Sequence, residues 1–199
     1  MATKMLLLLA LFGLACAELP YERSCDRVQP RDTPTRCSNY KNTVFIYDQL
    51  KMLQKRTDGL EAAPKIAFST SLSNSGFIYG GPSSVNLKLV FKRVISNIGN
   101  GYNPDTGIFT ASVKGLYYFT FTTVGCKSYD IRAMLMKNGA HQVSTNDHRS
   151  TDSTDSSSNA AALPLDAGDK VHVQLSANSR VFDNRNGYTT FSGFLLFSM

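Results

Sequence analysis

The sequence predicts an all-β fold, a sandwich of antiparallel strands preceded by a short helix. Between Lys65 and Met199, apolar residues recur at a period of two, in runs such as "IAFSTSL", "LYYFTFTTV", "KVHVQL" and "YTTFSGFLLF". This period is typical of strands that bury one face. Turn formers separate the runs, among them Asn-Gly, Gly-Gly-Pro and Arg-Asn-Gly. We therefore expect one β-sandwich domain over residues 65–199, long enough to bury a core of its own.

Residues 1–17 have the features of a secretory signal peptide. Lys4 precedes the apolar run "MLLLLALFGLA", and Ala15-Cys16-Ala17 supplies the small residues that a signal peptidase recognises. The run is too short to cross a membrane, and no later segment approaches the required length. We expect a secreted, extracellular chain that begins at Glu18 and has no membrane span.

The segment 18–42 is polar, rich in arginine and proline, and is expected to be irregular. It contains Cys25 and Cys37, which flank the loop "CDRVQPRDTPTRC". In an oxidising compartment these cysteines are disulfide candidates. They could pair within one chain or link neighbouring chains into larger oligomers, and the sequence leaves both alternatives open. Cys126, which follows an aromatic run, is interpreted as a buried thiol.

The segment 43–63 has the spacing of a short coiled-coil stalk. The seam of "IYDQLKMLQKRTDGLE" repeats at intervals of 4, 3, 4 and 3 residues, through Ile46, Leu50, Leu53, Thr57 and Leu60. Gly59 and Pro64 mark its end. Because a lone helix of this length is marginal in water, we expect it to pack against copies from neighbouring chains. The alternative is an amphipathic helix that lies on its own domain.

One group of positions is specific enough to indicate a family. It combines aromatic residues, an asparagine and a glycine at fixed spacings: Phe91, Asn97, Tyr102, Phe109, Gly115, Tyr117, Phe119 and Phe121. This pattern resembles the signature of the complement C1q globular domain, filled at every position. The likeness continues through "LPLDAGDKVHVQL" and "YTTFSGFLLF" and so covers residues 65–199.

The resemblance implies a ten-stranded jelly roll related to the tumour necrosis factor fold, and a homotrimer of such heads. The short stalk is more similar to the cerebellin-like and other short secreted members than to the collagen-stalked complement subunits, because glycine does not recur at every third position. In the family the collagen region recruits complement proteases. That activity is therefore not expected here.

The signature positions also have a direct structural interpretation. Tyr117, Phe119 and Phe121 alternate along one strand and therefore share one face, which we expect to fill the core. Gly115 suits a tight turn, and Asn100-Gly101 can adopt positive φ between two strands. We interpret these positions as core and turn rather than as ligand contacts.

The motifs of catalysis are missing from the sequence. The three histidines, His141, His148 and His172, have neither metal-ligand spacing nor a nucleophile elbow nearby, and His172 is expected to point outward from its strand. The net charge is +6, with acidic residues scattered among the basic ones, and it falls by one when Lys4 is removed. This mild excess does not indicate nucleic-acid binding. We expect a non-enzymatic binding protein.

The polar segment Ser144–Asn159, "STNDHRSTDSTDSSSN", is the first candidate for ligand contact. Within it we select Asp147, His148 and Arg149 as candidate contact residues. Asp147, Asp152 and Asp155 could offer oxygens to calcium, the one cofactor under consideration, although their spacing is not that of an EF-hand loop. The alternative is a solvated loop between two strands.

A basic group is the second candidate and contains Lys88, Lys92 and Arg93. On the rim of a trimer their charge would be repeated three times and would attract sulfated glycans or anionic microbial surfaces. In a single copy they would form only a solvated face. The heads should also be free of N-glycans, because the sequence contains no Asn-x-Ser/Thr acceptor.

Two functions fit these observations. One is innate-immune recognition of microbial or altered surfaces by repeated heads, which the basic charge and the hydroxyl-rich segment favour. The other is extracellular signalling or adhesion, in which heads bridge cell-surface receptors as cerebellin-like members do, and the missing collagen favours it.

Overall fold

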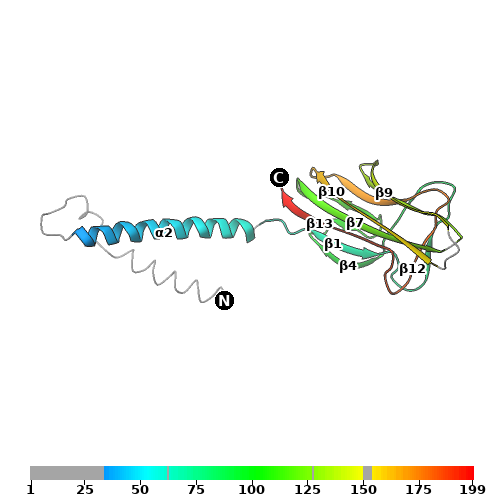
Figure 1. Ribbon diagram of the computed structural model, residues 1–199, viewed down its shortest axis with the longest axis horizontal. Coiled ribbons are helices and arrows are strands. Elements are labelled where there is room, and N and C mark those ends of the chain that lie inside the picture. Colours follow the sequence, from blue (N-terminus) through cyan, green and yellow to red (C-terminus); the bar gives the residue numbers. More distant parts are fainter. Residues whose placement is uncertain (1–33, 62, 127, 150–153) are drawn as a thin grey trace. The chain divides into compact units, whose positions relative to one another are not determined.

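The computed structural model describes residues 34–61, 63–126, 128–149 and 154–199. The chain divides into two compact units, Met1–Ala62 and Ala63–Met199. The described part of the first unit is the helix α2, Pro34–Glu61, and the second unit, which we call the head, contains all the strands (Figure 1). The expected signal peptide and Cys25 lie outside the described residues.

The helix α2 begins earlier in the sequence than expected. Residues 34–42, predicted to be irregular, are helical, and Pro34 occupies the first helical position, where its fixed φ is favourable. The helix ends at Glu61, with Gly59 inside its last turn. Among the described residues, no helix is both long and apolar enough to cross a membrane.

The apolar side chains of α2 are open to solvent in the single chain. Ile46, Leu50 and Leu53 of the predicted seam are about half exposed. Phe45 and Met52, which lie off the seam, are exposed as well. The helix thus carries apolar surface that a partner could cover.

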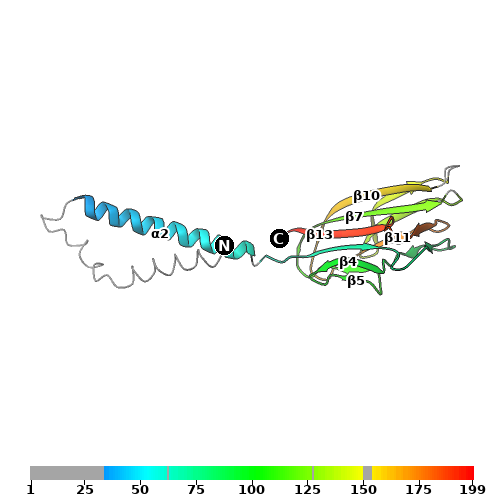
Figure 2. The same ribbon diagram turned by 90° about the horizontal axis from the view of Figure 1, so that it is seen from below.

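The head is built from two antiparallel sheets and a small two-stranded sheet (Figures 1 and 2). The five-stranded sheet has the order β10 (Thr154–Leu165), β7 (Gly115–Cys126), β13 (Thr190–Ser198), β1 (Ala67–Ser71) and β4 (Arg93–Ile98). The second sheet has the order β5 (Tyr102–Asn103), β6 (Ile108–Thr110), β11 (Lys170–Leu175), β8 (Ile131–Lys137) and β9 (Ala140–Asp147), with β3 (Leu87–Lys88) also paired to β11. β12 (Val181–Asp183) pairs with β2 (Ile78–Gly80).

The predicted β-sandwich is confirmed, with more strands than the ten expected. The described residues form thirteen strands, several of them only two or three residues long. The polar segment Ser144–Asn159 is mostly strand, because β9 continues to Asp147 and β10 begins at Thr154. The expectation of a loop there was therefore wrong except for the connection between these strands.

The signature aromatics fill the core between the sheets. Tyr117, Phe119 and Phe121 are fully buried, as the alternation predicted. Phe68 lies among them, 5.0 Å from the Tyr102 ring and 4.9 Å from the Phe191 ring, measured between centroids. Close contacts between aromatic rings of this kind supply much of the burial energy of a small domain.

The signature residues Phe91 and Tyr102 are joined by two hydrogen bonds. The Tyr102 hydroxyl donates to the Phe91 carbonyl and accepts from the Phe91 N–H, both at 3.1 Å. Burial raises the pKa of Tyr102 to about 12, although the bonds to the Phe91 backbone and to Thr70 act in the opposite direction. Asn97, another signature residue, fixes the same segment by accepting from the Tyr102 N–H and donating to the Tyr102 carbonyl.

Two of the predicted glycine and turn features have different outcomes. Of the pair Asn100-Gly101, Asn100 has the expected positive φ, 52°, whereas Gly101 does not, and the preceding Gly99 has φ of 78°. Gly115, expected in a tight turn, is instead the first residue of β7. A Cβ atom there would lie 2.6 Å from both the Leu195 side chain and the Phe197 carbonyl oxygen, so glycine permits the close approach of β13.

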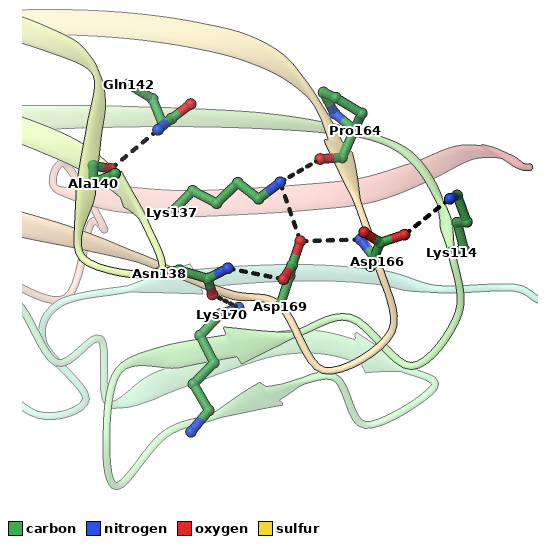
Figure 3. A network of polar contacts seen from close by, with 9 residues as sticks. All are labelled: Lys114, Lys137, Asn138, Ala140, Gln142, Pro164, Asp166, Asp169 and Lys170. Carbon is green, nitrogen blue, oxygen red and sulfur yellow. Dashed lines mark hydrogen bonds and ion pairs between the residues drawn. The ribbon is translucent and has the colours of Figure 1, made fainter.

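A polar network closes the end of the head at which β13 finishes (Figure 3). Asp169 accepts hydrogen bonds from the Asn138 side chain (2.8 Å) and the Asp166 N–H (3.0 Å), and pairs with Lys137 at 3.1 Å. These contacts, led by the bond from Asn138, lower the pKa of Asp169 to about 2. The network ties the β8–β9 turn to the β10–β11 turn.

Candidate binding site and assembly face

The candidate site lies at the end of the head where β13 begins, which we call the distal end. Here β7 finishes at Cys126, β10 begins at Thr154, and β12 pairs with β2. In Figure 1 this end, marked by β12, is opposite the C-terminus within the head. Two open hollows lie here.

The first hollow, which we call the cationic hollow, has a volume of about 650 Å³. Four separated segments of the chain line it, and they contribute Pro82, Ser128, Tyr129, Asp130, His148, Arg149 and Asn178. The predicted contact residues His148 and Arg149 are therefore in its wall. Asp147 is the last residue of β9, directly before them.

Asp130 organises the basic residues of the cationic hollow. Its carboxylate accepts a hydrogen bond from the Arg149 N–H at 3.1 Å, pairs with the Arg132 guanidinium, and lies 3.8 Å from Nδ1 of His148. The bond from Arg149 and the nearby charges of Arg132 and His148 lower the pKa of Asp130. The carboxylate thus stays ionised, and its oxygens already interact with groups of the protein.

Arg180 lies beside the cationic hollow. Its guanidinium carbon is 3.8 Å from the centre of the Tyr79 ring and 5.2 Å from that of Tyr129, a cation–π arrangement with two rings. Its backbone N–H donates to the Asp130 carbonyl at 3.1 Å. Its buried Nε has no hydrogen-bond partner among the described residues.

The second hollow, which we call the aromatic hollow, has a volume of about 540 Å³. Its aromatic wall consists of Phe77, Tyr79, Phe182 and Tyr188, with Phe182 at the centre of ring contacts of 6.2 to 6.4 Å. Phe77 is 74% exposed. The wall also includes the polar residues Thr154, Asp155, Ser156 and Asn184.

Cys126 lines the aromatic hollow as well. It is a free thiol and half-buried, so the expectation of a buried thiol was wrong. Its position explains the difference, because the last residue of β7 faces the hollow rather than the core.

The carboxylate of Asp183 binds the backbone of two loops that contribute to the aromatic hollow. Asp183 is fully buried and accepts hydrogen bonds from the backbone N–H groups of Ser73, Asn184 and Tyr188, at 2.9, 2.8 and 2.7 Å. These donors belong to the two loops that carry Phe77 and Tyr188. One buried side chain therefore sets the positions of both aromatic residues.

The calcium expectation gains no support from the described residues. They contain no group of three or more His, Cys, Asp or Glu side chains that could hold a metal ion. Asp155 lines the aromatic hollow, whereas Asp152 lies outside the described residues. The described carboxylates therefore do not form a calcium site.

The basic residues Lys88, Lys92 and Arg93 do not share one set of contacts. Lys88 is in β3, where it lies opposite Gln174 of β11 in the strand register. Lys92 pairs with Asp105 at 3.4 Å. Arg93 begins β4 in the other sheet and donates to the Arg185 carbonyl at 2.7 Å. Lys88 and Arg93 therefore belong to different sheets.

His172 behaves as the alternation in "KVHVQL" predicted. It is half-buried on β11, between the fully buried Val171 and Val173. Burial lowers the pKa of His172, so its ring is neutral at physiological pH.

Sequence reasoning missed Tyr79, Tyr129, Asp130 and Arg180. These residues come from three separate segments, and no periodic or motif signal connects them. Tertiary contacts bring them together, among them the pairing of β2 with β12 and the bridge between Asp130 and Ser179.

A second functional surface is the outer face of the five-stranded sheet, which we call the assembly face. One row across it consists of Ile98, Ala67, Phe194, Tyr118 and Ala162, in strand register. The Phe194 and Tyr118 rings are 5.5 Å apart, and Phe194 is 43% exposed. The next row contains only small residues, Ser96, Ser69, Ser192, Thr120 and Ala160. This face is partly apolar.

Comparison with known proteins identifies the head. The family model described as the C1q domain matches residues 67–196. The chain belongs to the C1q domain family. Its head is thus a C1q domain, and the resemblance based on the signature residues is confirmed.

Two curated relatives show how much of the chain is shared. The chain is 34% identical over 134 residues to Complement C1q tumor necrosis factor-related protein 3 of Mus musculus, covering 67% of this chain and 52% of the relative. It is also 34% identical over 138 residues to Complement C1q and tumor necrosis factor-related protein 9A of Homo sapiens, covering 68% and 40%. The chain therefore spans about half the length of these relatives or less.

Solved structures confirm the fold. The globular domain of zebrafish complement 1qA has a TM-score of 0.55 at 23% identity and covers 68% of this chain and 99% of that one. Eiger TNF from S. frugiperda has a TM-score of 0.54 at 17% identity, covering 68% and 95%. At these identities the likeness establishes the jelly-roll fold alone.

Family membership places this C1q domain among non-enzymatic ligand-binding proteins, as the sequence predicted. C1q and TNF-fold homologues are trimers, and C1q-related homologues are secreted.

Proposed function

We propose that this protein is a secreted homotrimer whose heads bind microbial or altered cell surfaces through their distal ends. The observation that supports this proposal is the separation of two surfaces within one head. The assembly face is partly apolar and carries a row of small residues, whereas the distal end carries open polar and aromatic hollows. One surface suits self-association and leaves the other free for ligands.

The assembly face favours packing against copies of the same chain. Phe194 is partly exposed although β13 lies in the middle of its sheet, and Leu196, Phe197 and Met199 extend the exposed apolar surface toward the C-terminus. Exposed apolar patches of this kind commonly mark protein interfaces. The neighbouring row of small residues allows a second sheet surface to approach closely. Three copies around one axis, as in the homologues, would cover these faces.

The helix α2 contributes to the same trimer as a short coiled-coil stalk. Its exposed seam residues Ile46, Leu50 and Leu53 need a partner in water, and two neighbouring copies provide one. Cys37 is part of this helix, and Cys25 precedes it. A disulfide between neighbouring chains would make the assembly covalent, and residues 1–17 would direct the chain to the oxidising secretory pathway.

The hollows at the distal end suit weak contacts repeated three times. Both are open, and their polar groups compete with water, so a single head gains little from each contact. A trimer presents three such sites at high effective concentration. Avidity then raises the apparent affinity by about 10² to 10⁴.

The second candidate function is a signalling or adhesion ligand that bridges cell-surface receptors. The helical stalk favours it, because a short helix places three heads close together, as receptor clustering requires. The same assembly face and the same trimer serve both functions. They differ in the chemistry of the partner.

A binding screen separates the two candidates. The intact trimer is applied to immobilised microbial polysaccharides and to arrays of receptor ectodomains under identical conditions. Saturable binding to polysaccharides, absent on receptor ectodomains, is the expected result. Saturable binding to ectodomains alone would overturn pattern recognition in favour of signalling or adhesion.

A further inference from the structure

We infer that Arg180 is the anion-binding residue of the distal end, and that the ligand is an acidic glycan. A carboxylate or sulfate group of the glycan binds the Arg180 guanidinium, while a neighbouring sugar ring of the glycan packs in the aromatic hollow. This inference rests on the proposed recognition of surfaces and specifies the class of ligand.

The guanidinium of Arg180 is held in place before any ligand arrives. It lies over the rings of Tyr79 and Tyr129, at 3.8 and 5.2 Å from their centres. Its Nε is buried and has no hydrogen-bond partner among the described residues, and the other N–H groups of a guanidinium lie in the same plane. Because the side chain is already ordered, binding an oxyanion costs less conformational entropy than it would for a mobile arginine.

The positive charge of Arg180 is not compensated within the described residues. No described carboxylate lies within ion-pair distance of it. The nearby Asp130 is occupied by Arg132, Arg149 and His148, and Asp183 by backbone N–H groups. The basic side chains around the cationic hollow therefore exceed the acidic ones. This excess selects an anion.

The aromatic hollow indicates that the anion is attached to a sugar. Tyr79 lines this hollow and also contacts Arg180, so a ligand on the ring adjoins the guanidinium. The partly apolar C–H faces of sugars pack on exposed rings such as Tyr79 and Tyr188. The polar residues Ser156 and Asn184 of the same wall are suited to sugar hydroxyls. Aromatic rings and uncharged polar groups beside a cation fit an acidic glycan better than an acidic protein segment.

The test uses the full-length trimer and four immobilised probes. These are a heparin-derived octasaccharide, a polygalacturonate oligomer that carries only carboxylates, neutral dextran and a poly-glutamate peptide. We expect binding to the two acidic glycans and little to dextran or the peptide. Binding to heparin alone would assign the anion as sulfate, and binding to both acidic glycans would assign a general oxyanion site, each in agreement with the inference.

Three variants connect the binding to Arg180. Arg180→Gln is expected to weaken binding to the acidic glycans about tenfold or more, the usual scale for a lost charge-assisted contact. Arg180→Lys should lose most of the same affinity, because an ammonium lacks the planar fork. Lys114→Gln removes one positive charge from an exposed side chain at the opposite end of the head and should change binding less than about twofold. Thermal unfolding of each variant verifies that the head is folded.

Several outcomes would overturn the inference. Wild-type affinity in Arg180→Gln, an equal loss in Lys114→Gln, or tighter binding to poly-glutamate than to the glycans would each do so. If Arg180→Gln unfolds, Tyr188→Ala provides the alternative test, since it should weaken glycan binding without reducing the salt dependence of that binding.

A different set of outcomes distinguishes this inference from the proposed function. If the protein bound neutral microbial polysaccharide and replacing Arg180 did not change that binding, the acidic glycan would be refuted and surface recognition would stand. Binding to no polysaccharide of any kind would refute the proposed function itself.

Discussion

The buried carboxylate of Asp183 accepts a hydrogen bond of 2.7 Å from the backbone N–H of Tyr188. The same side chain also accepts from the backbone N–H of Ser73, which lies in the loop that carries Phe77. A core carboxylate thus determines how two surface aromatics are presented.

Replacing Asp183 by asparagine should destabilise the head by about 2 kcal/mol. The change puts an NH₂ group where a carboxylate oxygen accepted from a backbone N–H, so a buried donor loses its partner. Urea denaturation measures the loss. Asp105→Asn is the matched control, because that carboxylate is 89% exposed, and its effect should stay below about 0.5 kcal/mol. Equal stability of the two variants would contradict the role of Asp183.

Tyr102→Phe should lower the stability at neutral pH by about 1 to 2 kcal/mol, because the Phe91 N–H and carbonyl lose their partner. The difference from the wild type should depend on pH. The pKa of Tyr102 is raised from 10.0 to about 12 in the folded protein, so its contribution is complete below pH 10 and is lost as the pH rises toward 12. Denaturation curves between pH 8 and about 12 test this. A difference that stays constant across that range would contradict the burial argument.

Asp169→Asn should reduce the thermal stability above about pH 5 and have little effect near pH 2. The pKa of Asp169 is lowered from 3.8 to about 2 by its hydrogen bonds and by Lys137, so its contribution is present above pH 3.8 and is lost as the pH falls through 2. Melting temperatures of both proteins across this range provide the measurement. Asp166→Asn is the control, because that side chain is 72% exposed. The network of Figure 3 would be unimportant if both variants melted like the wild type at pH 7.

The stalk should strengthen a trimer that the heads already form. Leu53→Asp places a charge in the predicted seam of α2 and should shift the monomer–trimer equilibrium toward monomer at a given concentration. Met52→Asp, at an equally exposed position off the seam, should have a smaller effect. Sedimentation velocity at several concentrations compares them. Equal effects of the two substitutions would show that α2 does not pack through this seam.

The sequence predicted the strands in which buried and more exposed side chains alternate strictly along the chain. β7 is the clearest case, since every second residue from Gly115 to Gly125 is buried. β10 was missed because its serines, threonine and asparagine resemble a loop, although each residue pairs with β7. Strands of two or three residues, such as β5 and β12, are too short to show a period. They form because neighbouring strands pair with them.

The candidate site was predictable only where its residues are adjacent in the chain. His148 and Arg149 were identified because they lie in one polar segment. Arg180 and Tyr79 are far apart in sequence and meet only through tertiary packing. Lys88 and Arg93 are close in sequence but belong to different sheets, so their grouping on one rim of a trimer stays a prediction.

Multivalent binding by three heads is tested most directly by surface plasmon resonance on an immobilised heparin-derived octasaccharide, comparing the trimer with a monomeric variant. Phe194→Lys puts a charge at the centre of the assembly face and should yield a folded monomer. Ser112→Lys, an exposed position outside that face, adds the same charge and should remain trimeric. The trimers should bind about 10² to 10⁴ times more tightly than the monomer at high probe density. Equal affinity of the folded monomer and the trimers would contradict multivalent binding and show that one head contains a complete site.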